Sequence, residues 1–202
     1  MSGQVSYPSR NISRLKVEDN FLDQDEFEKM RFDLFNPPTP VDWRYNSGVD
    51  YSNAEEHFMF NHIFYENNVP TSNQMGKISP ILQAMVNKRG GFVHLQQIKA
   101  NLYTRTPSVE VHKFHCDYDA EDPRSEMFNV SIFYINDNNG FTEFTDGTKV
   151  ESVENRLVTF PGNLSHRGTT CSDEKVRCVI NFRYFQEALK STMYQQDPPF
   201  KR

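Results

Sequence analysis

The first part of this chain shows hydrophobic residues at helical spacing. Asp23 is followed three residues later by Glu26, and this capping-box pattern marks the start of a helix. We therefore predict a helix over residues 24–35, ended by the prolines that follow it. One face of this helix carries the apolar residues Phe27, Met30 and Leu34. That face is expected to cover the outside of the core.

Further elements are expected before residue 92. Ser79 as N-cap, with Pro80 at the first helical position, predicts a second helix from 80 to about 88 that closes at Gly90-Gly91. Residues 15–17 form a short strand candidate. In 58–65 the ring-bearing residues Phe58, Phe60, His62 and Phe64 recur at every second position, which favours a strand, although the same run also fits a helix.

From Phe92 onward the pattern changes to alternation with a period of two, which is typical of strands. Within 98–103, Asn101 and Tyr103 share the face opposite to the apolar residues. Polar side chains on the inner face of a barrel need partners, and a bound co-substrate would supply them. The alternative is that Asn101 and Tyr103 lie on the barrel exterior.

Turn signals then follow at short intervals. Two of them, Asn139-Gly140 and Asp146-Gly147, are strong signals for two-residue hairpin turns. Short strands with tight turns over this length predict a barrel or jelly roll. The fold class is thus expected to be mainly β with flanking helices.

The length of 202 residues favours one domain with a substantial core. We predict a flexible N-terminal arm over 1–14 and a single domain over 15–202. Within that domain, 15–91 forms the helical and loop support, 92–185 the β core, and 186–202 a C-terminal tail, with a short helix from Gln186 to about Tyr194. Residues 36–56 read as a long loop of the kind that often forms lids.

Composition narrows the function classes. The net charge is −5 and basic residues are dispersed, so the footprint of a nucleic-acid binder is missing. Three cysteines give no disulfide framework, and the polar start lacks the apolar core of a signal peptide, so we expect a reducing, cytoplasmic location. No apolar run is long enough to predict a membrane span.

The candidate chemistry centres on His115 and Asp117. Two residues apart on a strand, they would point the same way and could bind one metal ion together. His166, at the end of a later β-like run, supplies a third candidate ligand. Two imidazoles and one carboxylate form the facial triad of non-haem Fe(II) oxygenases, which leaves positions open for substrate and O2.

Arg177 follows His166 after ten residues that read as a turn between antiparallel strands, so a permanent cation is expected near the metal. The pattern His115-x-Asp117, His166, Arg177 resembles the 2-oxoglutarate and Fe(II)-dependent dioxygenases, in particular the prolyl 4-hydroxylase-like branch and its short phage-encoded members. The segments Phe133–Asn136 and Gly140–Phe144 also resemble that branch.

The resemblance implies a double-stranded β-helix, or jelly-roll core, that binds Fe(II) and 2-oxoglutarate, with ascorbate as a further candidate cofactor. It implies that Arg177 pairs with the distal carboxylate of 2-oxoglutarate, and that Tyr134 hydrogen-bonds the same group. Further candidates for the co-substrate site are Tyr103, Asn101 and Asn181. The implied activity is hydroxylation of a C–H bond, coupled to decarboxylation of 2-oxoglutarate to succinate. For a phage-encoded member, the location would be the host cytoplasm.

Two residues are candidates for contact with the acceptor substrate. Arg183 shares a strand face with Arg177 and is expected at the open mouth, unless it forms a salt bridge with a nearby acid. Trp43 is either a substrate contact or a residue that packs on the barrel surface. His112 is expected on the strand face opposite to His115, away from the metal.

Other functions compete with this interpretation. The same triad could hold zinc for hydrolysis, although Arg177 would then have no role. Arg177 and Arg183 are six residues apart, as in nucleic-acid demethylases of the alkylation-repair type, but Val179 and Asn181 do not match that pattern. A non-catalytic metal-binding jelly roll is the third alternative. The acceptor itself is expected to be a peptidyl proline or a small molecule.

Overall fold

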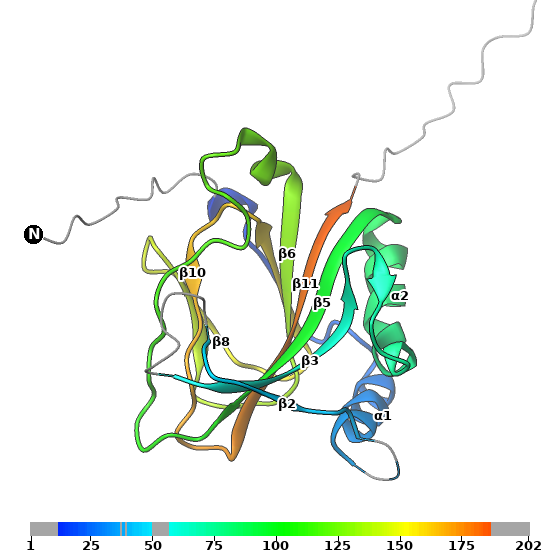
Figure 1. Ribbon diagram of the computed structural model, residues 1–202, viewed down its shortest axis with the longest axis vertical. Helices are drawn as coiled ribbons and strands as arrows, with labels where there is room; N and C mark the ends of the chain where they lie inside the picture. Colours follow the sequence, from blue (N-terminus) through cyan, green and yellow to red (C-terminus); the bar gives the residue numbers. More distant parts are fainter. Residues whose placement is uncertain (1–11, 37, 39, 50–56, 187–202) are drawn as a thin grey trace, which may run out of the picture.

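A computed structural model describes residues 12–36, 38, 40–49 and 57–186 of the chain. The strands of the described residues form two antiparallel sheets (Figure 1). The large sheet has the strand order β1-β9-β6-β11-β5-β3-β2, and β4 pairs with β3. Its strands are β1 (Lys16–Glu18), β2 (Arg44–Asn46), β3 (Met59–Glu66), β4 (Val69–Pro70), β5 (Phe92–Thr104), β6 (Phe128–Tyr134), β9 (Arg156–Pro161) and β11 (Val176–Gln186).

The small sheet has the order β10-β7-β8 and lies across from the large one. Its strands are β7 (Phe141–Phe144), β8 (Lys149–Glu151) and β10 (His166–Arg167). Two facing antiparallel sheets with these connections form the predicted jelly-roll core. Asp146-Gly147 turns the chain between β7 and β8 as expected, and Gly147 has a φ of +89°, which suits glycine. Asn139-Gly140, in contrast, closes no hairpin, because it carries the chain from β6 in the large sheet to β7 in the small one.

Two helices cover the outer face of the large sheet (Figure 1). Helix α1 (Gln24–Phe35) matches the prediction, and the Asp23 side chain caps it by accepting hydrogen bonds from the backbone N–H groups of Asp25 and Glu26. Helix α2 (Ser79–Arg89) begins one residue earlier than expected. Ser79 is its first residue and not its N-cap, because a 3-10 turn, η2 (Met75–Ile78), leads directly into it. The other 3-10 turns are η1 (Ile12–Arg14) and η3 (Pro123–Met127).

Alternating residues of the central strands supply two cores on opposite faces of the large sheet. On β11, Cys178 and Ile180 face the helices, whereas Val179 faces the small sheet. On β6, Phe133 packs towards the helices and Ile132 towards the small sheet. This period of two follows from the pleat of the strand. The candidate site lies on the small-sheet side, so the helical layer supports the large sheet from behind.

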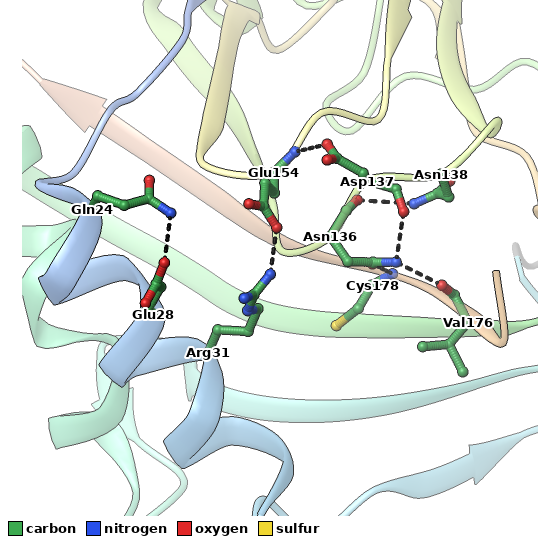
Figure 2. A network of polar contacts seen from close by, with 9 residues as sticks. All are labelled: Gln24, Glu28, Arg31, Asn136, Asp137, Asn138, Glu154, Val176 and Cys178. Atoms are coloured by element: carbon green, nitrogen blue, oxygen red, sulfur yellow. Dashed lines mark hydrogen bonds and ion pairs between the residues drawn. The ribbon is translucent and has the colours of Figure 1, made fainter.

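A polar network joins α1 to the start of β11 (Figure 2). Arg31 on α1 pairs with Glu154, whose backbone N–H donates to Asp137. The neighbouring Asn136 side chain accepts a hydrogen bond from Cys178 N at 3.0 Å and donates one to Val176 O at 2.9 Å. These two peptide groups flank residue 177. Asn136 therefore fixes the backbone from which the Arg177 side chain projects.

The remaining expectations on organisation differ from the structure in detail. Residues 58–65 fall in a strand and not a helix, and β1 lies one residue beyond the predicted 15–17. The predicted arm overlaps η1, where Arg14 donates a hydrogen bond to Glu126 O. The predicted loop over 36–56 contains β2. Gln186 ends β11, and the helix expected after it lies outside the described residues. No helix in the described ranges is long and apolar enough to cross a membrane.

Candidate metal centre

His115 and His166 face one another across a single antiparallel bridge. Each backbone N–H donates to the carbonyl oxygen of the other residue at 2.9 Å, and the two imidazole rings are 4.6 Å apart between centroids. Phe160 packs edge-on against His166 at 4.7 Å. The bridge between residue 115 and the short strand β10 thus brings together two histidines that are far apart in sequence.

Asp117 completes the cluster. One ligand atom from each of His115, Asp117 and His166 lies within 4.8 Å of the others. The three residues come together as predicted, but the predicted strand over 115–117 is wrong. His115 forms only an isolated bridge and Asp117 lies in a bend, so backbone curvature and not strand alternation brings the carboxylate round to the histidines.

The donor atoms of this cluster suit a divalent metal. His166 Nδ1 lies 3.1 Å from Leu164 O, so Nδ1–H donates there and Nε2 is left to bind a metal. Burial, reinforced by the nearby His115, lowers the pKa of His166 to about 4, which keeps the ring neutral, as a ligand must be. Asp117 Oδ2 is buried and accepts no hydrogen bond. A buried carboxylate oxygen without a hydrogen bond is costly unless a cation binds it.

A cavity between the sheets connects this cluster to Arg177. Arg177 is only 2% exposed. Its Nε donates to Ser152 Oγ at 2.9 Å, and Nη2 lies 3.4 Å from Phe141 O and Thr142 Oγ1. Among the residues that the structure describes, none of the ion pairs formed by carboxylates involves Arg177. A buried guanidinium with neutral partners alone is suited to an anionic ligand.

Tyrosines and a threonine surround this cation. Tyr103 lines the cavity, and its ring centroid lies 5.6 Å from the Arg177 guanidinium carbon. Tyr134 is fully buried and is not among the residues that line the cavity, so its hydrogen bond to the co-substrate stays a prediction. Its hydroxyl donates to Thr142 Oγ1 at 2.8 Å. Thr142 lines the cavity and was missed in the sequence, although it alternates with Phe141 and Glu143 in the Gly140–Phe144 segment.

The cavity wall remains polar further along β5 and β11, the strands that carry Tyr103 and Arg177. Asn101 and Asn181 line it, and each has a buried side-chain oxygen that accepts no hydrogen bond. The inner-face assignment of Asn101 and Tyr103 is thereby favoured over the barrel exterior. Lys99 also lines the cavity and was not identified from the sequence. The sequence did contain a signal: Lys99 lies two residues from Asn101, so on a strand the two side chains share one face.

Arg183 lies beside the metal cluster and does not line the cavity. Its Nη2 donates to the backbone oxygen of Asp117 at 2.5 Å, and its Nε lies 3.8 Å from Asp117 Oδ1. The guanidinium also stacks over the Tyr118 ring at 4.8 Å. Arg183 therefore forms a salt bridge with a nearby acid, which was one of its two expected roles. That acid is Asp117, a candidate metal ligand.

Two further residues lie elsewhere than expected. Trp43 stacks on Phe35 of α1, with centroids 6.0 Å apart, on the helical side of the large sheet. It is not among the residues that line the cavity, so it takes the alternative role of a packing residue. His112 is 4% exposed and lines the same cavity as His115, because the chain between them is not a regular strand. Its predicted place on an opposite strand face is wrong.

No protein-family model matches this sequence, and no curated protein matches it. Solved structures match its fold. The non-haem alpha-ketoglutarate-dependent epimerase SnoN from nogalamycin biosynthesis is 11% identical, with a TM-score of 0.58 over 85% of this chain and 76% of SnoN. HygX from Streptomyces hygroscopicus, with nickel and 2-oxoglutarate bound, is 11% identical, with a TM-score of 0.55 over 85% of this chain and 82% of HygX.

A third match is the viral collagen prolyl hydroxylase vCPH from Paramecium Bursaria Chlorella virus-1, in its 2-oxoglutarate complex. It is 13% identical, with a TM-score of 0.50 over 84% of this chain and 94% of vCPH. These identities are too low to transfer a substrate. The chain has the jelly-roll fold that 2-oxoglutarate and Fe(II)-dependent oxygenases share.

Proposed function

We propose that this protein is a 2-oxoglutarate and Fe(II)-dependent oxygenase that hydroxylates a C–H bond of its substrate. The observation that carries the proposal is the pairing of two features in one cavity. One is the cluster of His115, Asp117 and His166, and the other is the buried Arg177, which no carboxylate of the described residues neutralises. A dianion that chelates a metal at one end and carries a free carboxylate at the other would satisfy both.

The residues of the chain have separate tasks in this proposal. His115, Asp117 and His166 would hold Fe(II) and leave positions open for 2-oxoglutarate and O2. The iron would supply the activation of O2. Arg177 would bind the distal carboxylate of 2-oxoglutarate, with Thr142 and Tyr103 beside it. Tyr134 acts as a positioning residue, since its hydroxyl bonds to Thr142 Oγ1 behind the cavity wall.

The overall reaction balances without another reductant. One oxygen atom of O2 enters the substrate C–H bond and gives an alcohol. The other enters 2-oxoglutarate, which loses its C1 carboxylate as CO2 and becomes succinate. The two electrons from the C–H bond and the two from 2-oxoglutarate reduce O2 completely. Ascorbate would then serve only to restore iron oxidised in uncoupled turnovers.

The competing functions explain less of the site. Hydrolysis by zinc would leave the buried Arg177 without a role. A nucleic-acid demethylase would need a basic surface, whereas the net charge is −5. A non-catalytic module would have no need of a cationic pocket joined to a metal cluster. We propose further that residues 15–202 form the single catalytic domain, and that its acceptor is a small molecule or a peptidyl residue.

Spectroscopy of the complex tests the proposal. Fe(II) and 2-oxoglutarate are added to the metal-free protein without oxygen, and the visible charge-transfer band of the chelate is recorded. Admission of O2 should then yield succinate and CO2 in equal amounts. The same measurements are made on Arg177→Met, which removes the cation proposed to bind 2-oxoglutarate. Arg105→Met is its matched control, because Arg105 is exposed. Absence of both band and succinate in the wild type would overturn the proposal.

A further inference from the structure

The cavity contains a second cation, Lys99, placed away from Arg177. In the register of β5 and β11, Tyr103 pairs with Arg177, whereas Lys99 pairs with Asn181. Lys99 and Asn181 are each four residues along their strands from that first pair. At about 3.3 Å per residue, the two cationic positions are separated by roughly 13 Å along the strands. They therefore belong to different ends of one pocket.

Among the described residues, the Lys99 ammonium has no hydrogen-bond or ion-pair partner, and the only one of them that is acidic and lines the cavity is Asp117, a candidate metal ligand. Burial is the main cause that lowers the pKa of Lys99. The charges of Asp117 and Glu66 oppose this shift, and the charge of Arg183 adds to it. Across the strand pair, Asn181 has a buried amide oxygen without a hydrogen bond. Rotation of that amide would present its NH2 group to an anion beside Lys99.

The charges of the cavity indicate what this end can bind. Among the described residues that line it, Lys99 and Arg177 contribute two positive charges and Asp117 one negative charge. Fe(II) and dianionic 2-oxoglutarate would cancel one another. One positive charge is then left over, and we assign it to Lys99, because Arg177 would pair with the co-substrate. An uncompensated charge on a half-buried side chain is costly, so a ligand with one negative charge would complete the site.

From these observations we infer that Lys99 and Asn181 form a carboxylate-binding subsite for the acceptor, and that the acceptor is a small molecule with a free carboxylate. The inference rests on the proposed function and deepens it. One ammonium and one amide match the two oxygens of a carboxylate, whereas a neutral peptidyl proline would leave Lys99 unpaired. The free carboxylate would hold the acceptor while its C–H bond faces the metal.

The test uses acetate as a carboxylate probe and acetamide as its neutral counterpart. Each is added without oxygen to the full-length protein loaded with Fe(II) and 2-oxoglutarate. The paramagnetic relaxation of its methyl protons is measured, and the charge-transfer band is followed in the same sample. Acetate should relax much faster than acetamide in the wild type. Lys99→Met should weaken acetate binding roughly tenfold or more, with the band unchanged. Lys175→Met, at an exposed lysine, is the matched control.

The outcomes separate the two proposals. If the wild type shows no charge-transfer band, the proposed function fails and the subsite fails with it. If the band forms but acetate and acetamide relax alike, or Lys99→Met leaves acetate relaxation unchanged, the carboxylate subsite alone is overturned. A loss of 2-oxoglutarate affinity in Lys99→Met would also overturn it, because Lys99 would then bind the co-substrate. Asn181→Asp places a carboxylate in the subsite beside Lys99. This variant should stay folded and should repel acetate.

Discussion

Gly140 lies directly against the Arg177 side chain: a β-carbon on residue 140 would come within 2.6 Å of Arg177 Cδ. The same β-carbon would meet Thr170 O at 2.6 Å, and a backbone oxygen cannot move aside as easily as a side chain. The absence of a side chain at 140 therefore sets how deeply Arg177 lies beneath β7. This close contact explains why residue 140 is a glycine, although the hairpin predicted at Asn139-Gly140 does not form.

Gly140→Ala should consequently displace Arg177 and weaken 2-oxoglutarate binding. We expect a loss of roughly tenfold or more in affinity, with overpacking that costs about 1–3 kcal/mol in the free energy of unfolding. Iron binding should be retained, since the metal ligands lie elsewhere. Titration of Fe(II) and then 2-oxoglutarate measures both affinities. Gly91→Ala is the control, because a β-carbon there would meet nothing within 4 Å. Equal co-substrate affinity in the two variants would contradict the role of Gly140.

Arg177→Met should have a larger effect on the same step. It removes a charge-assisted pair and leaves a carboxylate in a dry pocket, at a cost of roughly 3–5 kcal/mol. That cost corresponds to about two to nearly four orders of magnitude in the dissociation constant of 2-oxoglutarate. Arg177→Lys should recover only part of the loss, because an ammonium lacks the planar fork of a guanidinium. A variant that binds 2-oxoglutarate within a few-fold of wild type would falsify the co-substrate assignment.

Asp117→Ala should weaken iron binding and abolish 2-oxoglutarate turnover, because the cluster loses its only anionic ligand. Its comparison is His112→Ala, which changes another cavity residue that is not one of the three clustered ligands. We expect iron affinity to stay nearly intact in that second variant. Iron content after desalting and succinate production distinguish the two. Unchanged succinate in Asp117→Ala, or an empty metal site in His112→Ala, would mean that the ligand set is wrong.

Asn136→Ala should loosen Arg177 without touching the cavity. It removes the hydrogen bonds to Val176 O and from Cys178 N, and we expect about 1–3 kcal/mol lower stability to denaturant. A role in positioning Arg177 predicts in addition a raised dissociation constant for 2-oxoglutarate, while iron affinity is unchanged. Asn36→Ala, which loses a side-chain hydrogen bond to Phe32 O at the end of α1, is the control. If Asn136→Ala lowers stability alone, its role is only structural.

The cluster of His115, Asp117 and His166 was predictable from sequence because a His-x-Asp pair, a distant histidine and a later arginine form a sparse pattern. The bend that joins His115 to Asp117 was not predictable. A regular strand would also have placed the two side chains on the same side, so the sequence pattern did not distinguish a strand from a bend. His112 was misplaced, and Trp43 was left open between two roles, because local periodicity does not encode which side of a sheet a loop will follow. Lys99 was overlooked because a lysine in an alternating strand ordinarily faces water.

The pairing of strands is the level at which sequence reasoning was weakest. Asn139-Gly140 carries a hairpin signature, yet its flanking strands belong to different sheets. Turn propensity specifies that a chain reverses, whereas partner choice depends on which apolar faces are buried together. The division of β6 and β11 into two cores shows that second requirement. Fold class could be predicted from short strands and turns, but sheet order required the complete packing.

Strand β11 carries Arg177, Asn181 and Arg183 on one face, at the middle of the large sheet between β5 and β6. A single inserted residue before this strand would turn Arg177 and Asn181 away from the cavity and Arg183 away from Asp117 at once. Substitutions at residue 181 or at its neighbour Lys99, in contrast, leave the backbone and Arg177 in place. Acceptor preference can therefore diversify among descendants of this chain while co-substrate use is inherited unchanged.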